Sequence, residues 1–440
     1  MDLLPLLRRS VLVVALGLTW GGEYLAAEPG FTVTQTAPAG IYAVGEPITW
    51  NVLLHDVADP KSAVVTYTVL QGGLTTLAKG TLPADGRITA TLDVPGTVLL
   101  NLSAKLPGVD KALIGAGGAV AEPRKIAPAE PIPDDFTAFW DGKLAAQNAI
   151  PMNPQFEKKP GGKAGIDYGH LTLDTINNSH IRGQLARPAD GKKHPAVLIV
   201  QYAGVYPLKP DWVTGYAGGG WLALNILAHD QPIDEPAKFY EDLSAGALKS
   251  YTAIGNEDRE KSYFLRMFLA CSRAVDYLAL QPDWDGKTLI VTGVSQGGLQ
   301  AIVAAGLNPK VTGILINVPA GCDNNAELAG RKPGWPYWLA KVDDPKKAGE
   351  VARYFDAVHF AARIRCPALV GVGLLDVTAR PAGIFAAINQ MQGPTEVVVM
   401  PNATHKTDHT PFNVRKNAWD SLLRSGKPLL VGPSPAGHLP

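Results

Sequence analysis

The stretch TLIVTGVSQGGLQAIVAA, residues 288–305, decides the fold of this chain. Its first five residues are apolar or β-branched and predict a strand, whereas residues 299–305 predict a helix. Between them lies Gly293-Val-Ser-Gln-Gly-Gly298, a tight turn with a serine at its apex. Small residues on both sides allow the strained backbone that such a turn requires. We therefore expect the hydroxyl of Ser295 outside the carboxyl edge of a sheet, near the free amides at the start of the helix.

Two further residues complete a candidate catalytic set through their order along the chain. After a serine turn of this kind, an acid is expected past a later strand and a histidine past the last strand. Asp376 follows the predicted strand 368–372, and His405 comes shortly after the strand predicted to end at Met400. His409 lies where the last helix should begin, so we favour His405. The chemistry needs all three groups, because serine is a weak nucleophile until an oriented base takes its proton.

Apolar runs alternate with helical stretches from about residue 134 onward. This alternation predicts a mostly parallel sheet that is covered by helices on both faces. An amphipathic helix capped by Asp134 or Asp135 opens this part of the chain, and a long helix is expected from about residue 260 to residue 280. A hairpin of residues 170–175 and 181–187 precedes the apolar strands, which are expected at residues 196–200, 221–226, 288–292, 311–316, 368–372 and 396–400.

The chain before residue 134 has a different character. Residues 28–114 contain short β-branched runs separated by turn residues, which predict a small antiparallel sandwich of immunoglobulin type. Residues 115–133 are rich in Gly and Ala and then in Pro, so we expect a linker. Residues 134–440 would then form the domain that carries all the candidate chemistry. We therefore expect the sandwich to be a spacer or packing module whose removal spares reactions on small molecules.

Composition limits the partners of the protein. The 40 Lys and Arg residues balance 40 Asp and Glu residues, so no basic surface argues for nucleic acid or an anionic membrane. Residues 1–27 combine Arg8-Arg9, an apolar run too short to span a bilayer and a small-residue cleavage site. This pattern predicts a signal peptide and a secreted or periplasmic protein without membrane attachment after its removal. Three cysteines form no disulfide framework, and we expect Cys271 to fill the core face of its helix.

Several motifs together resemble those of the acetyl xylan esterases and cephalosporin C deacetylases of carbohydrate esterase family seven. The Ser-Gln-Gly-Gly form of the serine turn, and Gly-Leu-Leu-Asp376 followed by Phe385-Ala-Ala-Ile-Asn389, are more specific than a serine between glycines. The resemblance implies an α/β-hydrolase fold and a serine esterase that forms an acyl-enzyme. It spans roughly residues 131 to 424 and also includes Pro133-Asp-Asp-Phe136 with Phe139-Trp140, Ser262-Tyr-Phe264, Arg273-Ala-Val275 and His405.

The resemblance assigns roles to individual residues. It maps a catalytic triad onto Ser295, Asp376 and His405, in agreement with the order of these residues in the chain. It maps an oxyanion hole onto the backbone amides of Gln296 and Val205.

The sequence departs from the family pattern at three places. Val205 stands where the family usually has a tyrosine, Lys406 where it has a glutamate, and residues 227–232, Leu-Ala-His-Asp-Gln-Pro, where it has an Arg-Gly-Gln-Gly motif. A backbone donor survives the change at Val205, so the implied oxyanion hole is retained. The missing arginine motif changes the expected loop packing and, with the added sandwich, leaves the oligomeric state open.

The combined prediction is an exported serine esterase that removes O-acetyl groups from xylan or xylo-oligosaccharides. Tyr202 and its neighbours at the oxyanion hole would line an acyl pocket that the resemblance implies to be small. Trp335 and Tyr337 lie in an insertion between strands and would form an aromatic wall for a sugar ring, or else pack in the core. No histidine spacing suggests a metal site, and no cofactor is implied.

Two other hypotheses stay open from the sequence. One is a hydrolase of the same fold with another acyl or peptide substrate. The other is a non-catalytic carbohydrate-binding protein with a relic triad, against which the presence of Ser295, Asp376 and His405 argues. A panel of esters tests the first hypothesis, and labelling with a serine-directed phosphonate tests the second.

Overall fold

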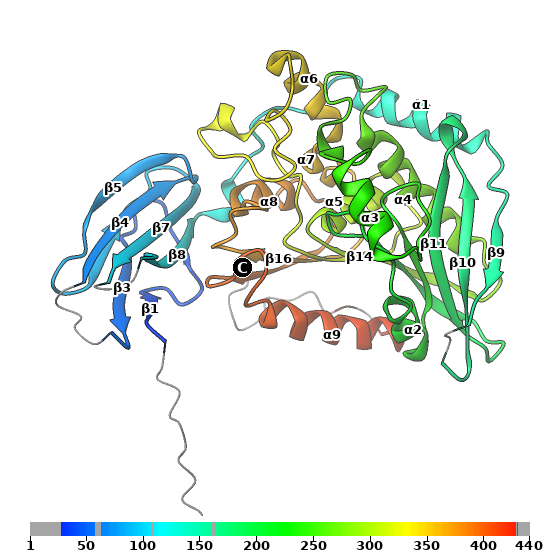
Figure 1. Ribbon diagram of the computed structural model, residues 1–440, viewed down its shortest axis with the longest axis horizontal. Helices are drawn as coiled ribbons and strands as arrows, with labels where there is room; N and C mark the ends of the chain where they lie inside the picture. The colour runs from blue at the N-terminus through cyan, green and yellow to red at the C-terminus, as the bar shows by residue number, and fades with distance from the viewer. Residues whose placement is uncertain (1–27, 58–62, 107–109, 161–162, 428, 430–440) are drawn as a thin grey trace, which may run out of the picture.

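The computed structural model describes residues 28–57, 63–106, 110–160, 163–427 and 429. The predicted signal peptide, residues 1–27, and the chain from residue 430 lie outside these ranges. Figure 1 shows a smaller part made of strands beside a larger part in which helices surround a sheet. Within the described ranges, no helix combines the length and the apolar character needed to cross a membrane.

The N-terminal part consists of two sheets that enclose a common core. Trp50, Val69 and Leu100, from three different strands, are fully buried in this core. Buried and more exposed side chains alternate along much of β7, as expected when one face of a sheet is covered. One sheet contains β1 (Gly30–Gln35), β3 (Ile48–His55) and β6 (Arg87–Ala90), and the other contains, in order, β2 (Ile41–Tyr42), β8 (Leu113–Ala121), β7 (Gly96–Lys105), β4 (Val64–Gln71) and β5 (Thr75–Thr81).

The predicted linker, residues 115–133, is wrong over its first seven residues. They belong to β8, which pairs with β7 along its whole length. A Cβ on Gly117 would lie 2.6 Å from the ring of Trp50, and a Cβ on Gly115 would lie 2.7 Å from the ring of Phe31. The small residues that suggested flexibility are therefore needed because the facing sheet approaches this strand closely.

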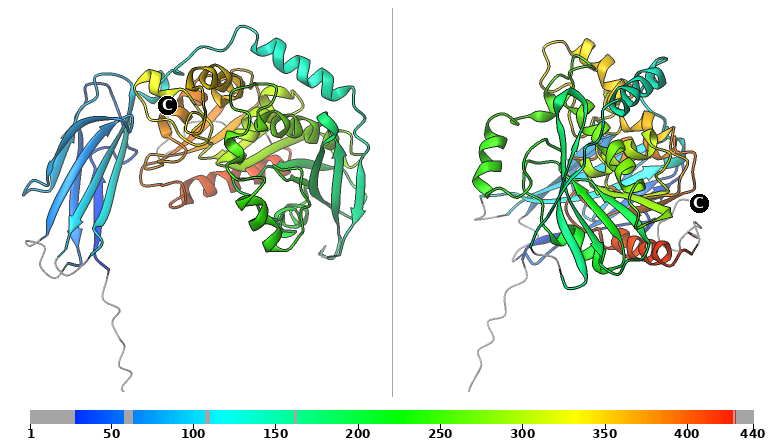
Figure 2. Two further views of the ribbon diagram at one scale, coloured as in Figure 1. Left: turned by 45° about the horizontal axis from the view of Figure 1, so that its top comes forward. Right: turned by 90° about the vertical axis from the view of Figure 1, so that its right-hand side faces the viewer.

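The sandwich packs against the C-terminal part near the loop that carries Asp376. A Cβ on Gly118 of β8 would lie 2.6 Å from the carbonyl oxygen of Leu374. The amide of Lys332 donates a hydrogen bond of 2.9 Å to the carbonyl of Gly72, which follows β4. In the left view of Figure 2, the sandwich and the antiparallel hairpin strands lie at opposite ends of the molecule.

The C-terminal part is built on a nine-stranded sheet. Six of its strands pair in parallel, so the predicted parallel sheet is confirmed. Asn177 and Asn178 connect the predicted hairpin with φ values of 55° and 53°, a conformation that asparagine tolerates well. The order is β17 (Thr395–Met400), β16 (Ala368–Gly373), β15 (Gly313–Asn317), β14 (Trp284–Val294), β12 (His194–Ile199), β13 (Leu222–Ile226), β11 (His180–Pro188), β10 (Ile166–Asp174) and β9 (Gln155–Lys158).

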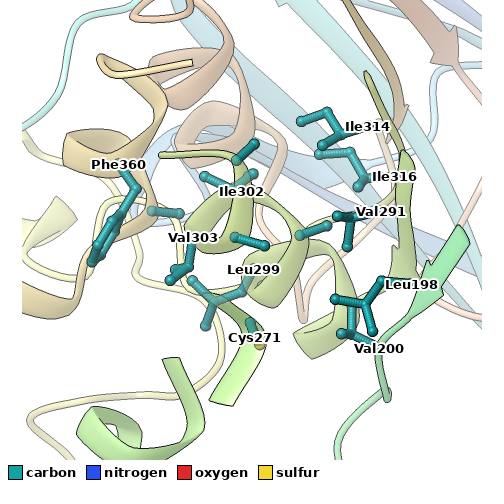
Figure 3. Packing of buried hydrophobic residues seen from close by; sticks show 14 of the residues in the cluster. Leu198, Val200, Cys271, Val291, Leu299, Ile302, Val303, Ile314, Ile316 and Phe360 are labelled. Atoms are coloured by element: carbon teal, nitrogen blue, oxygen red, sulfur yellow. The ribbon is translucent and has the colours of Figure 1, made fainter. Parts of the chain in front are cut away.

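Helices cover both faces of this sheet. In Figure 1, α2 and α9 lie on one side, and α4, α5 and α8 lie on the other. Every residue of α5 is buried, because α4 and α7 cover it on the sides that do not face the sheet. Figure 3 shows Leu299, Ile302 and Val303 of α5 among side chains of the strands and of α7. Each such side chain contributes about 1.5–3 kcal/mol by burial. The helices are α1 (Phe136–Asn148), α2 (Asp211–Gly218), α3 (Ala237–Ala245), α4 (Tyr263–Ala279), α5 (Gln296–Leu307), α6 (Pro345–Phe355), α7 (Ala357–Ala361), α8 (Pro381–Ile388) and α9 (Thr410–Arg424).

Two of the helices predicted from the sequence are α4 and α1. The predicted long helix is α4, and Cys271 is buried in it as a free thiol. The first helix, α1, follows Asp135, whose side chain makes no capping hydrogen bond. Its carboxylate instead accepts hydrogen bonds from Arg259, at 2.7 Å, and from the hydroxyl of Tyr354. The predicted position of the cap is confirmed, because Asp135 is the N-cap residue of α1, but its carboxylate binds a cation instead of the helix amides.

Candidate active site

Ser295 occupies the predicted turn between β14 and α5. Its φ of 58° lies in a region that residues other than glycine rarely adopt. The turn is so tight that a Cβ on Gly293 would lie 2.4 Å from the carbonyl carbon of Gly297. A Cβ on Gly297 would lie 2.5 Å from the carbonyl oxygen of Val200, in the loop after β12. The predicted strand, turn and helix are confirmed, and the flanking glycines are required by these close approaches.

A continuous chain of hydrogen bonds joins Ser295, His405 and Asp376. The Oγ of Ser295 lies 2.9 Å from Nε2 of His405, and Nδ1 of His405 lies 2.7 Å from Oδ2 of Asp376. Because an ionised carboxylate only accepts, Nδ1 carries the proton and Nε2 offers its lone pair to the serine hydroxyl. The fold thus brings together the three residues that were selected by their order in the sequence. This arrangement is able to remove the serine proton during attack on an electrophile.

The carboxylate of Asp376 is fixed from both sides. Its Oδ1 accepts hydrogen bonds from the amides of Thr378 and Ala379, both at 2.8 Å. The side chain is completely inaccessible to solvent. The two backbone donors hold Oδ1, so Oδ2 stays directed at His405 without reorganisation during a reaction.

The loop between β17 and α9 presents His405. The side chain of Thr404 accepts hydrogen bonds from the amides of Lys406 and Thr407, both at 3.2 Å. His409 donates from Nε2 to the carbonyl of Thr404 at 2.9 Å. We expected the ring of His409 near the cap of the last helix, and it precedes α9 but makes no capping bond. Its ring orders the loop, whereas His405 is the histidine that contacts Ser295.

The backbone amides of Gln296 and Val205 have no acceptor among the described residues. Gln296 is the first residue of α5, where a helix leaves its amides without intrahelical acceptors. Val205 lies in the loop between β12 and α2, whose start contacts Gly297. These are the two donors that the family resemblance implied for an oxyanion hole, and both are available for a ligand oxygen.

Sequence reasoning missed the side chains that hold the loop between β12 and α2. The amide of Gly204 donates to the hydroxyl of Tyr251 at 3.3 Å, and that hydroxyl donates to Oε1 of Gln296 at 2.5 Å. The carbonyl of Gly204 accepts a hydrogen bond of 2.9 Å from Nε2 of His229. His229 belongs to residues 227–232, and the departure of that stretch from the family motif was the only signal in the sequence.

These supporting groups are neutral at neutral pH. Burial lowers the pKa of His229 to about 4, although the bond to the carbonyl of Gly204 raises it in part. Burial also raises the pKa of the Tyr251 hydroxyl, so this group keeps its proton. The loop is therefore held by hydrogen bonds between uncharged groups. The protonation of these groups does not change over the pH range in which a histidine acts as a base.

Trp335 lies beside this loop. It lines a hollow of about 330 Å³ together with Val205 and Tyr251. The edge of its ring contacts Phe264 of α4, with ring centroids 6.0 Å apart. The ring is therefore supported by the core on one side and open to the hollow on the other.

The structure separates Tyr337 from Trp335. Tyr337 lines a different cavity of about 540 Å³, which it shares with Trp338 and Glu130. Tyr337 and Trp335 line different cavities although they are two residues apart. The predicted common aromatic wall of Trp335 and Tyr337 is therefore wrong. Tyr202 is half exposed and stacks on Tyr206, with ring centroids 4.6 Å apart.

A partly buried cation, Arg380, lies next to the loop of Asp376. Burial lowers the pKa of Arg380, while the neighbouring Tyr337 and Asp376 raise it. A Cβ on Gly73 of the sandwich would lie 3.0 Å from the Arg380 guanidinium, so the N-terminal part covers this side chain.

Over the described ranges, no group of three or more His, Cys, Asp and Glu side chains is arranged to hold a metal ion.

Comparison with known proteins identifies the family of this chain. A sequence model of the family described as "Acetyl xylan esterase (AXE1)" matches residues 120–423. The chain belongs to the acetyl xylan esterase family. It is therefore a hydrolase that acts on carboxylic esters, and the resemblance noted from the sequence is confirmed.

One relative and two solved structures are similar to this chain. Acetyl esterase Axe7A of Xylanibacter ruminicola is 30% identical over 380 residues, which cover 83% of this chain and 84% of that protein. An acetyl xylan esterase from Paenibacillus sp. R4 has a TM-score of 0.59 at 22% identity, over 69% of this chain and 98% of its own. Acetyl Xylan Esterase 1 from Thermoanaerobacterium sp. JW/SL YS485 has a TM-score of 0.57 at 19% identity, over 68% of this chain and 98% of its own. The predicted α/β-hydrolase fold of the C-terminal part is confirmed.

Proposed function

We propose that this esterase removes O-acetyl groups from xylan or xylo-oligosaccharides, with Ser295, His405 and Asp376 as its catalytic triad. The observation that carries the proposal is the unbroken chain of hydrogen bonds from Oγ of Ser295 to the carboxylate of Asp376. Membership of the acetyl xylan esterase family supports the acetylated carbohydrate as substrate. The relatives named for acetyl and acetyl xylan ester hydrolysis support the acetyl group.

Acylation begins when Oγ of Ser295 attacks the carbonyl carbon of the acetyl ester. His405 takes the serine proton on Nε2, and the carboxylate of Asp376 stabilises the imidazolium that results. The negative charge on the carbonyl oxygen is received by the amides of Gln296 and Val205. When the tetrahedral intermediate collapses, the bond to the sugar oxygen breaks, and His405 returns the proton to the leaving alcohol.

Deacylation repeats the same steps with water. His405 removes a proton from a water molecule, whose oxygen attacks the acetyl-serine carbonyl. The second tetrahedral intermediate uses the same two amides and then releases acetate, while the proton returns to Oγ of Ser295. The hollow of about 330 Å³ beside Val205 and Trp335 is the proposed place for the ester and the sugar ring next to it.

We extend the proposal to the N-terminal segments. Residues 1–27 would direct export to the periplasm or the medium, as their charged start, apolar run and small-residue site suggest. The two sheets of residues 30–121 would form an immunoglobulin-type sandwich.

Two measurements on the purified protein test the proposal. A serine-directed fluorophosphonate should label the protein at Ser295, and Ser295→Ala should abolish both labelling and ester hydrolysis. A panel of acetylated xylo-oligosaccharides and 4-nitrophenyl esters of rising acyl length should show acetate release and a preference for acetyl. Labelling without acetate release from any acetylated sugar would indicate an esterase for another substrate, and absence of labelling would refute the proposed triad.

A further inference from the structure

We infer that His229 is a positioning residue for the oxyanion hole: it holds the peptide between Gly204 and Val205 so that the amide of Val205 points at the developing oxyanion. This inference rests on the proposed function, because it needs Val205 to be an oxyanion donor. It assigns a role to the stretch, residues 227–232, in which this chain departs from the motif of its family.

The argument starts from the geometry of one peptide unit. The Gly204–Val205 peptide is trans, since the cis bond found among the described residues is Trp335–Pro336. In a trans peptide the carbonyl and the following amide point in opposite directions from the same plane. Nε2 of His229 binds the carbonyl oxygen of Gly204 at 2.9 Å. A donor that pins the carbonyl on one side therefore fixes the direction of the Val205 amide on the other side.

The peptide needs such an anchor because the backbone at Gly204 does not by itself restrict the orientation of the peptide plane. Gly204 has a φ of 134°, which residues with a side chain rarely adopt, and a Cβ there would lie 3.0 Å from the ring of Tyr206. Glycine supplies this conformation but also permits others. Among the described residues, the other hydrogen bond of Gly204 runs from its amide to the hydroxyl of Tyr251, at 3.3 Å. Side chains from outside the loop, rather than the loop itself, therefore set the peptide plane.

The hydrogen bonds of His229 specify its tautomer. The carbonyl of Gly204 only accepts, so Nε2 must carry the ring proton. Nδ1 then accepts from the hydroxyl of Tyr263, at 2.7 Å, the first residue of α4. The imidazole is almost completely buried and its edge contacts the ring of Tyr251, with centroids 4.8 Å apart. Burial lowers the pKa of His229, which keeps the ring in the neutral form that this pair of bonds requires.

The stretch that carries His229 is itself anchored. The carboxylate of Asp230 accepts hydrogen bonds from the amide of His180, at 2.8 Å, and from Nε of Arg182, at 3.0 Å. Both partners belong to β11 of the central sheet. The neighbour of His229 is thus tied to a rigid element, so the imidazole is presented to the Gly204 carbonyl in one position.

A series of substitutions at this position tests the inference. His229→Leu should lower kcat for 4-nitrophenyl acetate about 10²- to 10³-fold, the loss typical of one oxyanion donor. KM should stay within about threefold, because the lost interaction is made mainly in the transition state. His229→Gln places an amide N–H near the position of Nε2 and should recover kcat to within about tenfold of the native value. His229→Asn is equally polar but too short to reach Gly204, so it should resemble His229→Leu.

His359→Leu is the matched control. His359 is as buried as His229 and has a pKa lowered to about 4 by burial, but it packs on Phe136, away from the serine turn. This variant should lose stability without the loss of kcat. The inference is overturned if folded His229→Leu or His229→Asn keeps kcat within about threefold, or if His229→Gln is as slow as His229→Asn. If His229→Leu does not fold, the comparison of Gln with Asn decides. A native protein that neither hydrolyses acetyl esters nor reacts with a phosphonate would instead refute the proposed function.

Discussion

Replacing Asp376 by asparagine separates the orientation of the catalytic histidine from the burial of a carboxylate. In the native protein, Oδ2 accepts from His405, and Oδ1 accepts from the amides of Thr378 and Ala379. Asparagine must place its NH₂ group at one of these two positions. At the Oδ1 position it would leave two buried amides without an acceptor, which costs about 1–3 kcal/mol for each. At the Oδ2 position it can donate to Nδ1 once the imidazole changes its tautomer.

We therefore expect the NH₂ group of Asp376→Asn to face His405. The imidazole then holds its proton on Nε2 and cannot take the proton of Ser295. In triads of this kind such a change lowers kcat about 10⁴-fold, which corresponds to about 5 kcal/mol in the barrier. Every donor keeps a partner, so the free energy of unfolding should change by less than about 1 kcal/mol. Asp376→Ala instead leaves both amides unpaired and should lose about 2–6 kcal/mol of stability.

The assay combines initial rates on 4-nitrophenyl acetate with urea unfolding of the native protein and both variants. The expected pattern is a similar loss of kcat in the two variants, with a large loss of stability in Asp376→Ala alone. If Asp376→Asn kept kcat within about tenfold of the native value, Asp376 would not control the tautomer of His405. If the asparagine variant were as unstable as the alanine variant, the side-chain orientation deduced from the backbone donors would be refuted.

Four further expectations follow from the site. His405→Ala should lower kcat about 10⁴-fold, whereas His409→Ala should keep most of the activity, and equal losses in the same ester assay would contradict the assignment of the base. 4-Nitrophenyl acetate should react faster than the butyrate or the octanoate. The rate should fall roughly 10- to 200-fold for each methylene group that the acyl pocket cannot hold. A preference for octanoate would indicate a larger pocket. A chain that starts at residue 122 lacks β8, which contacts Leu374 near Asp376. The sequence alone predicted that such a truncation keeps its activity, but we now expect kcat on small esters to fall at least about tenfold. Full activity of a folded truncation would show that the sandwich is only a spacer. Burial lowers the pKa of His359 from 6.5 to about 4. Between these pH values the unfolded chain binds a proton at His359 that the folded chain does not bind. The free energy of unfolding should therefore fall as the pH falls. Urea unfolding from pH 7.5 to about pH 4.5 should show a weaker fall in His359→Leu, and an unchanged slope would contradict this account.

The sequence by itself determined the elements around Ser295 because their signals are local. The apolar run of β14, the glycines of the turn and the apolar helix α5 are consecutive in the chain. Each residue is therefore selected by its neighbours in the same segment, and the pattern can be recognised without knowing the fold. The choice of His405 over His409 followed for a related reason, since the order of strands constrains which loops reach the carboxyl edge of the sheet.

The tertiary structure decided the features that depend on close approach between distant segments. The glycines of β8 suggested a linker, and only the ring of Trp50 against Gly117 shows why a strand needs them. Trp335 and Tyr337 are two residues apart, and only the structure shows that they line different cavities.

His229 is the clearest case, because its role requires a partner that no local pattern indicates. It is separated from Gly204 by a helix and a strand, and the two meet because β12 and β13 pair in parallel, so the loops after both strands lie at the same edge of the sheet. A buried histidine has no sequence signal that distinguishes a core residue from one that holds an oxyanion loop. Its neighbours in space, and not its neighbours in the chain, determine which of the two it is.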